Sequence, residues 1–203
     1  MIKGLYSAAS AMITGVYRQQ AVAHDIANVD TPGFKQILTS LEDFDTTYAY
    51  TQTTDNSSSS PVYLGEIGLG VMAAPETTDF SQGELKTTDS ELDFAIEGEG
   101  FFMIQTADGV RYTRDGRFSR DAAGNLVNVD GYRVLGPNGQ SITLPEGEVS
   151  VSTDGTIYVN DVNSGTIGLA YFEDLTTLSR YGENTFSSTA TPATTGGGSG
   201  AVT

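Results

Sequence analysis

The side chains that could take part in catalysis are few. The chain of 203 residues contains a single histidine, His24, and no cysteine. A Ser-His-Asp triad would depend on that histidine, and disulfides and thiolate metal ligands are excluded. His24 falls inside an apolar heptad pattern, where a helical residue beside a packing seam is the better interpretation. The sequence therefore predicts no nucleophilic catalytic site.

Carboxylates are numerous enough to raise the question of acid–base or metal chemistry. Glu97 and Glu99 could flank a sugar as a glycosidase pair, but their glycine neighbours are typical of a solvated turn. The stretch Asp121–Asn125, followed by Asp130, is loosely similar to a calcium loop. It lacks the alternating acidic ligands and the terminal glutamate that such a loop requires. We predict turns at both places, with no metal, no cofactor and no enzymatic activity.

Arginines recur at every third position through one part of the chain. They are Arg111, Arg114, Arg117 and Arg120. Turn residues interrupt this stretch, so a basic helix is not indicated, and no phosphate-binding G-x-x-x-x-G-K-[ST] loop is present. The favoured interpretation is local pairing with Asp108, Asp115 and Asp121. A contact with an acidic neighbouring subunit is the alternative.

The composition argues against nucleic-acid binding and against membrane insertion. The chain has 10 basic and 26 acidic residues, which give a formal net charge of −16, and such a surface repels phosphate backbones. No apolar run approaches the roughly 20 residues of a membrane span. The apolar start is broken by Ser7 and Ser10, so it does not fit a cleaved signal peptide. The 24 glycines suit a loop-rich β protein.

Residues 2–26 predict a helix that carries a narrow coiled-coil seam. Apolar side chains recur at alternating spacings of three and four, with Gln19 as the polar exception. The seam consists of Ile2, Leu5, Ala9, Met12, Val16, Ala23 and Ile26. Such a stripe does not stabilise an isolated helix, so we expect a partner helix. The helix is expected to end near Asn28, before the turn Thr31-Pro32-Gly33.

The pattern changes to short strands after about residue 61. Asp-Gly and Asn-Gly dipeptides recur at 108–109, 115–116, 130–131, 138–139 and 154–155, and each favours a tight hairpin turn. Apolar runs around them predict strands at 94–96, 101–104, 110–113, 132–135, 142–144, 156–159 and 167–172. The predicted fold class is mainly β, with an antiparallel β domain preceded by a coiled-coil-forming helix.

Four segments follow from these patterns. Residues 1–35 form the N-terminal helix and turn, and 36–60 form an extended linker that ends in a Ser/Thr-rich run. Residues 61–187 form the β domain. The Ser/Thr/Gly-rich tail, 188–203, is expected to be flexible.

Two long motifs, in order, resemble one known family. The stretches Gly4–Met12 and Asp25–Lys35 are similar to the start of bacterial flagellar rod and hook proteins. The stretches Gln82–Leu85, Leu92–Phe102 and Tyr112–Phe118 are similar to the central β domain of that family. The motif residues are Asn28, Thr31, Gly33, Phe34, Gly98, Gly100, Phe101, Phe102, Arg114, Asp115 and Gly116.

The resemblance implies a structural role in a helical polymer. Family members pair an N-terminal with a C-terminal helix to line a hollow axle, the periplasm-spanning basal-body rod or the hook. Expected partners are copies of the chain, neighbouring rod and hook proteins, and the type III export apparatus, which needs no cleaved signal. The family's C-terminal helix does not follow residue 203, so we expect a truncated chain.

A later segment of the chain favours the distal rod as the position along the axle. Phe172–Phe186 resembles the distal rod pattern, in which a strand leads to a Gly-x-Asn-x-Phe turn; proximal rod and hook are the alternatives. From another class, a secreted adhesin-like β module with a coiled-coil stalk would also explain the heptads, but not the ordered motifs.

Overall fold

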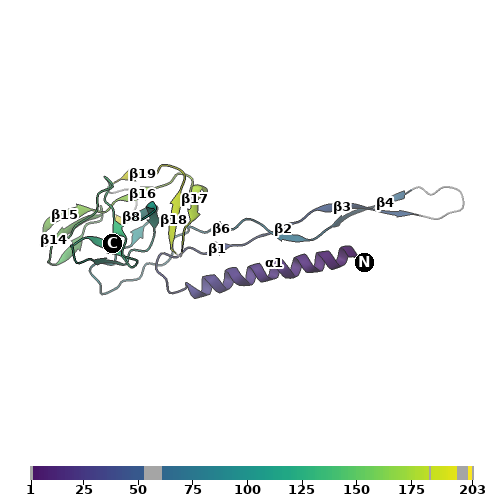
Figure 1. Cartoon of the computed structure of the whole chain (residues 1–203), viewed down its shortest axis with the longest axis horizontal. Coiled ribbons are helices and arrows are strands. Elements are labelled where there is room, and N and C mark those ends of the chain that lie inside the picture. Colours follow the sequence, from purple (N-terminus) through teal and green to yellow (C-terminus); the bar gives the residue numbers. More distant parts are fainter. Residues whose placement is uncertain (1, 53–60, 183, 196–200, 203) are drawn as a thin grey trace. The chain divides into compact units, whose positions relative to one another are not determined.

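A computed structural model of the chain describes residues 2–52, 61–182, 184–195 and 201–202 (Figure 1). The chain divides into two compact units, and each is discontinuous in sequence. The first unit combines Met1–Val29 with Gln36–Asp79, and the second combines Asp30–Lys35 with Phe80–Thr203. The backbone therefore passes between the units three times.

Helix α1 (Ile2–Ala27) occupies the segment for which the heptads predict it. At its end the Asn28 side chain donates to the carbonyl oxygen of His24 at 2.9 Å, and the Asn28 backbone N–H contacts the same oxygen at 3.2 Å. These bonds satisfy a carbonyl that has no partner further along the helix. Asn28 thus caps the helix at the predicted place.

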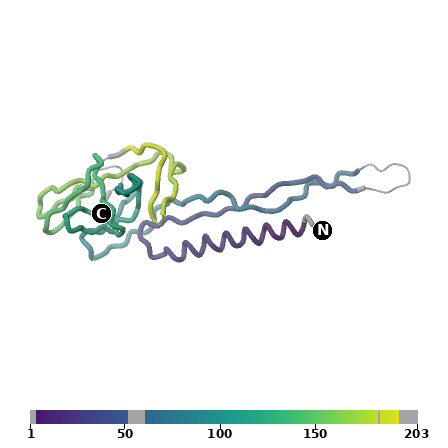
Figure 2. Tube along the Cα trace, viewed as in Figure 1, coloured from purple at the N-terminus to yellow at the C-terminus, as the bar shows by residue number. Residues whose placement is uncertain are grey.

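The rest of the first unit is an antiparallel ribbon with three paired stretches. The outgoing arm holds β1 (Ile37–Leu38), β2 (Leu41–Asp43) and β3 (Thr46–Gln52), and the returning arm holds β4 (Pro61–Gly68), β5 (Val71–Ala73) and β6 (Thr77–Thr78). The pairs are β1 with β6, β2 with β5, and β3 with β4. Figure 2 follows the two arms along the Cα trace.

This ribbon differs from the predicted linker and from the predicted start of the β domain. Residues 36–52 form paired strands, and their partners are residues 61–79, which the sequence assigned to the β domain. Alternating Thr, Tyr and Ala at 46–51 suits a strand, but the pairing partner cannot be identified from local pattern alone. Most of the Ser-rich run, 53–60, lies outside the described residues.

The second unit contains an antiparallel sheet centred on β8 (Phe101–Thr106). Along the sheet the order is β10 (Phe118–Arg120), β11 (Leu126–Asn128), β12 (Arg133–Val134), β8, β9 (Gly109–Thr113), β18 (Thr185–Ser188) and β17 (Leu178–Arg180). Strand β16 (Leu169–Tyr171) also pairs with β8, and β19 (Ala193–Thr195) pairs with β16. The 3₁₀ helix η1 (Leu175–Thr177) precedes β17.

Two further groups of strands complete this unit. Strands β13 (Val149–Val151), β14 (Thr156–Val159) and β15 (Val162–Thr166) form a small antiparallel sheet, and β7 (Ile96–Glu97) pairs with β20 (Ala201–Val202). The predicted mainly β, antiparallel fold with an N-terminal helix is confirmed. The predicted strand at 142–144 is wrong: this segment makes only an isolated bridge, Asn125 with Thr143.

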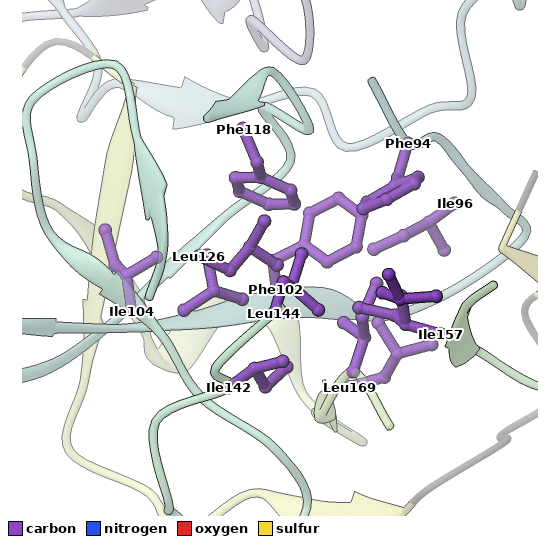
Figure 3. Close-up of a cluster of buried hydrophobic side chains, with 13 residues drawn as sticks. Phe94, Ile96, Phe102, Ile104, Phe118, Leu126, Ile142, Leu144, Ile157 and Leu169 are labelled. Atoms are coloured by element: carbon purple, nitrogen blue, oxygen red, sulfur yellow. The ribbon is translucent and has the colours of Figure 1, made fainter. Parts of the chain in front are cut away.

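Successive side chains of β8 supply two separate cores. Phe102 and Ile104 belong to one buried cluster, and Phe101 and Met103 to another, because neighbouring strand residues point to opposite faces. Figure 3 shows the first cluster, in which Phe102 lies among side chains such as Phe118 and Leu144. Burial of both faces explains why residues 101–104 read as a continuous apolar run.

The predicted flexible tail is partly wrong. Ala193–Thr195 pairs with β16 and Ala201–Val202 pairs with β7, so these stretches are strands. Threonine is a good strand former. The low-complexity Ser/Thr/Gly composition of the tail nevertheless led us to expect flexibility and not strands. Residues 196–200 and 203 lie outside the described residues.

Candidate assembly surface and motif cluster

The predicted seam of α1 faces away from the ribbon and is open. Leu5 is 69% exposed, Met12 67% and Val16 53%. Ile26 and Ala23 are also exposed, whereas Ala9 is half-buried; the side chain of Ile2 lies outside the described residues. Contiguous exposed apolar surface of this kind marks an interaction site.

The opposite side of α1 makes the helix's contacts with the ribbon. Among the described helix side chains Thr14 is the buried one, at 3% exposure. Its hydroxyl donates to the Ser10 carbonyl oxygen at 2.7 Å, and the Ser10 hydroxyl accepts from the Val71 N–H at 3.2 Å. Nearer the helix end, Asp25 Oδ1 accepts from the Ile37 N–H at 3.3 Å. Small polar groups, and not the apolar seam, therefore hold the helix within its unit.

The ribbon carries a second exposed apolar surface on β3 and β4. The rings of Tyr48 and Tyr50 both contact that of Tyr63, with centroids 5.9 and 5.7 Å apart. All three side chains are exposed, as is Leu64 at the register shift of this hairpin. Exposed aromatic clusters are typical of contact surfaces. The sequence did not single out this surface.

The N-terminal motif separates into two places. Asn28 belongs to the end of α1 in the first unit, whereas Thr31, Gly33 and Phe34 belong to the second. There the Thr31 carbonyl oxygen accepts from the Phe34 N–H at 3.3 Å, which closes a turn. Gly33 has a φ of +71°, and a Cβ at this position would overlap the backbone of Arg114. A residue without a side chain is therefore required where the turn meets the β unit.

Two side chains, one at the end of β17 and one in the loop after it, hold this turn in place. Asn184 Nδ2 donates to the Pro32 carbonyl oxygen at 2.9 Å, and Arg180 Nη2 donates to the carbonyl oxygen of Lys35. The Arg180 guanidinium lies 5.0 Å from the centre of the Phe34 ring. Arg180 and Asn184 are missing from the sequence-based list of site residues. The Gly-x-Asn-x-Phe pattern, Gly182–Phe186, was the signal that could have identified Asn184.

Lys35 is buried, and its ammonium group has a definite partner. Nζ donates to the Ser81 carbonyl oxygen at 2.7 Å. A buried charge is costly unless it is hydrogen-bonded, so this bond is expected to be well ordered. It joins the segment that leaves the β unit at Lys35 to the segment that returns at Phe80.

The central motif lies around the start of β8 and the loop after β9. Gly98 lies between β7 and β8, and a Cβ at Gly100 would lie 3.1 Å from the Tyr171 ring. A Cβ at Gly116 would overlap the carbonyl group of Phe94. The Phe94 N–H donates to the Gly116 carbonyl oxygen at 2.9 Å, so the two backbone segments lie close together. These motif glycines thus allow close packing around Phe101 and Phe102.

The four spaced arginines have four different environments. Arg117 binds both carboxylate oxygens of Asp115, at 3.1 and 2.7 Å, and this hydrogen bonding raises the pKa of Arg117. Arg114 is 5.1 Å from the Phe101 ring and donates to Gln82 Oε1 at 3.3 Å; burial lowers its pKa.

The other two arginines lie elsewhere on the surface. Arg120 donates to the Pro145 carbonyl oxygen at 2.7 Å, and Arg111 lies over the Tyr181 ring. The predicted local pairing is confirmed for Asp115. It is wrong for Asp108, whose Oδ2 accepts from the Tyr181 hydroxyl at 2.6 Å, and for Asp121, which binds its own turn.

The other candidate chemical groups serve local structure. His24 Nδ1 lies 3.9 Å from Asp25 Oδ1, and the His24 carbonyl oxygen accepts the hydrogen bond from the Asn28 side chain that caps the helix. Glu97 and Glu99 are exposed on either side of Gly98. Within the described residues no group of three or more His, Asp or Glu side chains could hold a metal ion. In the same part of the chain no helix is long and apolar enough to cross a membrane.

Comparison with known proteins gives consistent matches to both motif regions. A family described as "Flagella basal body rod protein" matches residues 5–35, and one described as "Flagellar hook protein FlgE/F/G D1 domain" matches residues 95–159. These are the regions that contain the seam with its following turn, and the two-faced strand β8.

Similar curated proteins cover almost all of the chain. The flagellar basal-body rod protein FlgG of Bacillus subtilis is 34% identical over 198 residues, which is 92% of this chain and 73% of the relative. FlgG of Borreliella burgdorferi is 35% identical over 205 residues, 94% of this chain and 75% of the relative. The rod protein FlgF of Caulobacter vibrioides is 34% identical over 197 residues, 95% of this chain and 76% of the relative.

Proposed function

Because this chain belongs to the family of flagellar basal-body rod and hook proteins, we propose that it is an axial subunit of the distal rod, which assembles helically with copies of itself and with adjoining axial subunits. The family is structural and not enzymatic, and the relatives FlgG and FlgF are basal-body rod proteins. The distal position within the rod is a more specific proposal than membership of the family. It is supported by the resemblance of Phe172–Phe186, while a FlgF at similar identity keeps the proximal rod as the alternative.

The open seam of α1 carries this proposal. Leu5, Met12 and Val16 expose apolar surface in a heptad row, on the helix side opposite the contacts with β5. Complete burial of each of these side chains would contribute about 1.5–3 kcal/mol. An interface that uses different surfaces on its two sides repeats without closing, and it therefore generates a helix of subunits. A helical tube packed in this way resists twisting and so can transmit torque.

Two further points complete the proposal. The tyrosine surface of β3 and β4 offers a second apolar contact between subunits, separate from the seam. The proposal also includes export through the flagellar type III apparatus, which the resemblance to the rod and hook family implies. An adhesin-like stalk would use the same seam for a closed helical bundle and would not place the protein in the rod.

The test compares two valines of the same helix in a flagellated strain that makes only the variant protein. Val16 is 53% exposed on the seam, and Val22 is 56% exposed away from it. Val16→Asp would bury an unpaired charge against a partner helix, which is expected to cost several kcal/mol. We expect loss of swimming and of intact rods for V16D, and near-normal swimming for V22D.

Leu5→Asp and Met12→Asp extend the same test along the seam and should behave as V16D does. A thermal melt of each purified variant provides the folding control, because the seam makes no contribution to the β unit's core. Normal rods in all three seam variants would show that α1 is not the polymerisation element and would refute the proposed function.

A further inference from the structure

We propose that Lys35, Arg180 and Asn184 form a clamp that fastens together the three backbone connections between the two units, so that twisting load is shared among them. This inference deepens the proposed function and rests on it, because only a subunit that transmits torque needs such a clamp. The three residues are positioning residues: each acts on a backbone segment and not on a ligand.

The topology defines what the clamp must hold. The backbone passes between the units at 29–30, 35–36 and 79–80. Any torque that the backbone carries from one unit to the other must pass through these three connections. A single connection would be a weak transmitter of torque, because each residue has two soft dihedral angles about which the chain can turn. Three connections that are fixed to one another cannot turn independently.

Each connection is fixed on the β-unit side by a named contact. The first connection ends in the turn whose Pro32 carbonyl oxygen accepts from Asn184 Nδ2 at 2.9 Å. The second begins at Lys35, whose carbonyl oxygen accepts from Arg180 Nη2. The third ends beside Ser81, whose carbonyl oxygen accepts from Lys35 Nζ at 2.7 Å. Contacts therefore run from the end of β17 and the loop after it, through the turn, to the returning segment.

Aromatic packing makes the same region stiff. Phe80, directly after the third connection, packs on Phe101 and Phe186 with ring centroids 5.7 and 5.3 Å apart. The Arg180 guanidinium lies between two rings, 5.0 Å from Phe34 and 6.0 Å from Phe186. Such cation–π contacts add to its hydrogen bond with the turn. Phe101 and Phe186 belong to a buried core, so the clamp is attached to one of the two cores of the unit.

The chain offers a matched pair of glycines to open the clamp. Gly33 and Gly139 both have a φ of +71°, so alanine is equally strained at both positions. A Cβ at Gly33 would overlap the Arg114 backbone, whereas a Cβ at Gly139 meets nothing within 4 Å. Gly33→Ala should therefore displace the turn, and Gly139→Ala controls for backbone strain alone.

A second, shape-conserving pair of variants tests the hydrogen bonds that Asn184 Nδ2 donates. Asn184→Asp replaces the Nδ2 donor by an oxygen that repels both the Pro32 carbonyl oxygen and the Asp115 carboxylate, 3.5 Å away. Asn163→Asp makes the same change of charge on the surface, where the oxygen that accepts from the Gly165 N–H is kept. Both variants replace one asparagine by aspartate, but only Asn184→Asp changes a contact of the clamp.

The first measurement is hydrogen exchange of the purified chain. We expect the amides of residues 31–35 to exchange about tenfold faster in G33A and N184D than in the wild type, since one hydrogen bond corresponds to roughly that factor. Amides of β8 should be unchanged, and G139A and N163D should match the wild type. Unchanged exchange at residues 31–35 in both clamp variants would overturn the proposal.

The second measurement is made in cells that carry only the variant protein. G33A and N184D should assemble rods in normal number but sustain a lower stall torque in tethered cells. A variant that merely folded less well would instead yield fewer rods, so the number of rods separates the two causes. Faster exchange together with unchanged torque would overturn the mechanical role of the clamp. That outcome would leave the distal rod proposal intact, because the proposal depends on the seam variants V16D, L5D and M12D.

Discussion

Asp121 organises the turn that follows β10 with its own side chain. One carboxylate oxygen accepts the backbone N–H groups of Ala123 and Asn125, both at 2.8 Å, and the other accepts Asn125 Nδ2 at 2.9 Å. These bonds explain why a stretch that loosely resembles a calcium loop needs no ion: the carboxylate is already occupied by donors of its own turn.

The same bonds predict a pH-dependent effect of Asp121→Asn. The hydrogen bond from the Asn125 side chain, followed by that from the Asn125 backbone, lowers the pKa of Asp121. A carboxyl whose pKa is lower in the folded state stabilises the fold above its unfolded pKa of about 3.9. This contribution is lost as the pH falls through the folded pKa. Urea unfolding should show D121N less stable than the wild type at pH 7, with the difference vanishing at lower pH. A difference that stays constant down to about pH 3 would contradict this origin.

Single residues of the motif cluster were only partly accessible to sequence reasoning. Gly33 could be assigned to a turn because glycine follows proline, and the structure gives it a φ of +71°. Its contact with Arg114 could not be foreseen, since nothing in a local pattern says which backbone approaches a glycine. Arg180 has no local signature at all, because its hydrogen-bond partner, the Lys35 carbonyl, lies 145 positions earlier.

At the scale of elements, α1 is a helix with two unlike faces. The face towards the ribbon is small and polar, and its contacts centre on Ser10 and Thr14. The opposite face carries the heptad seam and remains exposed. Apolar burial dominates helix stability in proteins, so we expect this helix to be held weakly while its seam is exposed.

Hydrogen exchange of the isolated monomer should reveal this difference between elements. We expect the amides of α1 to exchange at least about tenfold faster than those of β8, because local opening of the helix exposes little new apolar surface. Strand β8 has both faces buried and should exchange only with global unfolding. Equally slow exchange in a verified monomer would mean that the ribbon holds α1 more firmly than its polar contacts suggest.

At the scale of the whole molecule, two units are interleaved along one chain. The second unit takes six residues, Asp30–Lys35, from between the helix and the ribbon. Its two hydrophobic cores are nevertheless formed by residues after Leu92, with Phe80 packed at the edge. The unit should therefore fold without the first 79 residues, although it would lose the turn that Asn184 and Arg180 hold.

A fragment of residues 80–203 should melt in one cooperative transition. Residues 61–187, the β domain expected from sequence, should be less stable, because this fragment lacks β19 and β20 and carries β4–β6 without their partners. Thermal unfolding followed by circular dichroism compares the two directly. If the shorter-tailed fragment melted at the same or a higher temperature, the strands after residue 187 would contribute nothing, and the division at Asp79 would lose its energetic support.

The sequence by itself determined the helix, its seam, the mainly β class and the family. Each of these depends on information carried locally: a heptad repeat over residues 2–26, turn dipeptides between apolar runs, and two ordered motifs. Local patterns suffice there because helix periodicity and turn chemistry involve residues only a few positions apart.

Tertiary structure alone decided which distant segments meet. It paired residues 36–52 with 61–79, placed the last described strand against β7, and brought Asn184 to Pro32 across 152 positions. Polar side chains such as Asn184 and Arg180 can satisfy their hydrogen bonds with any nearby carbonyl group. Their partners were therefore fixed only when the two buried cores of β8 set the positions of the strands around it.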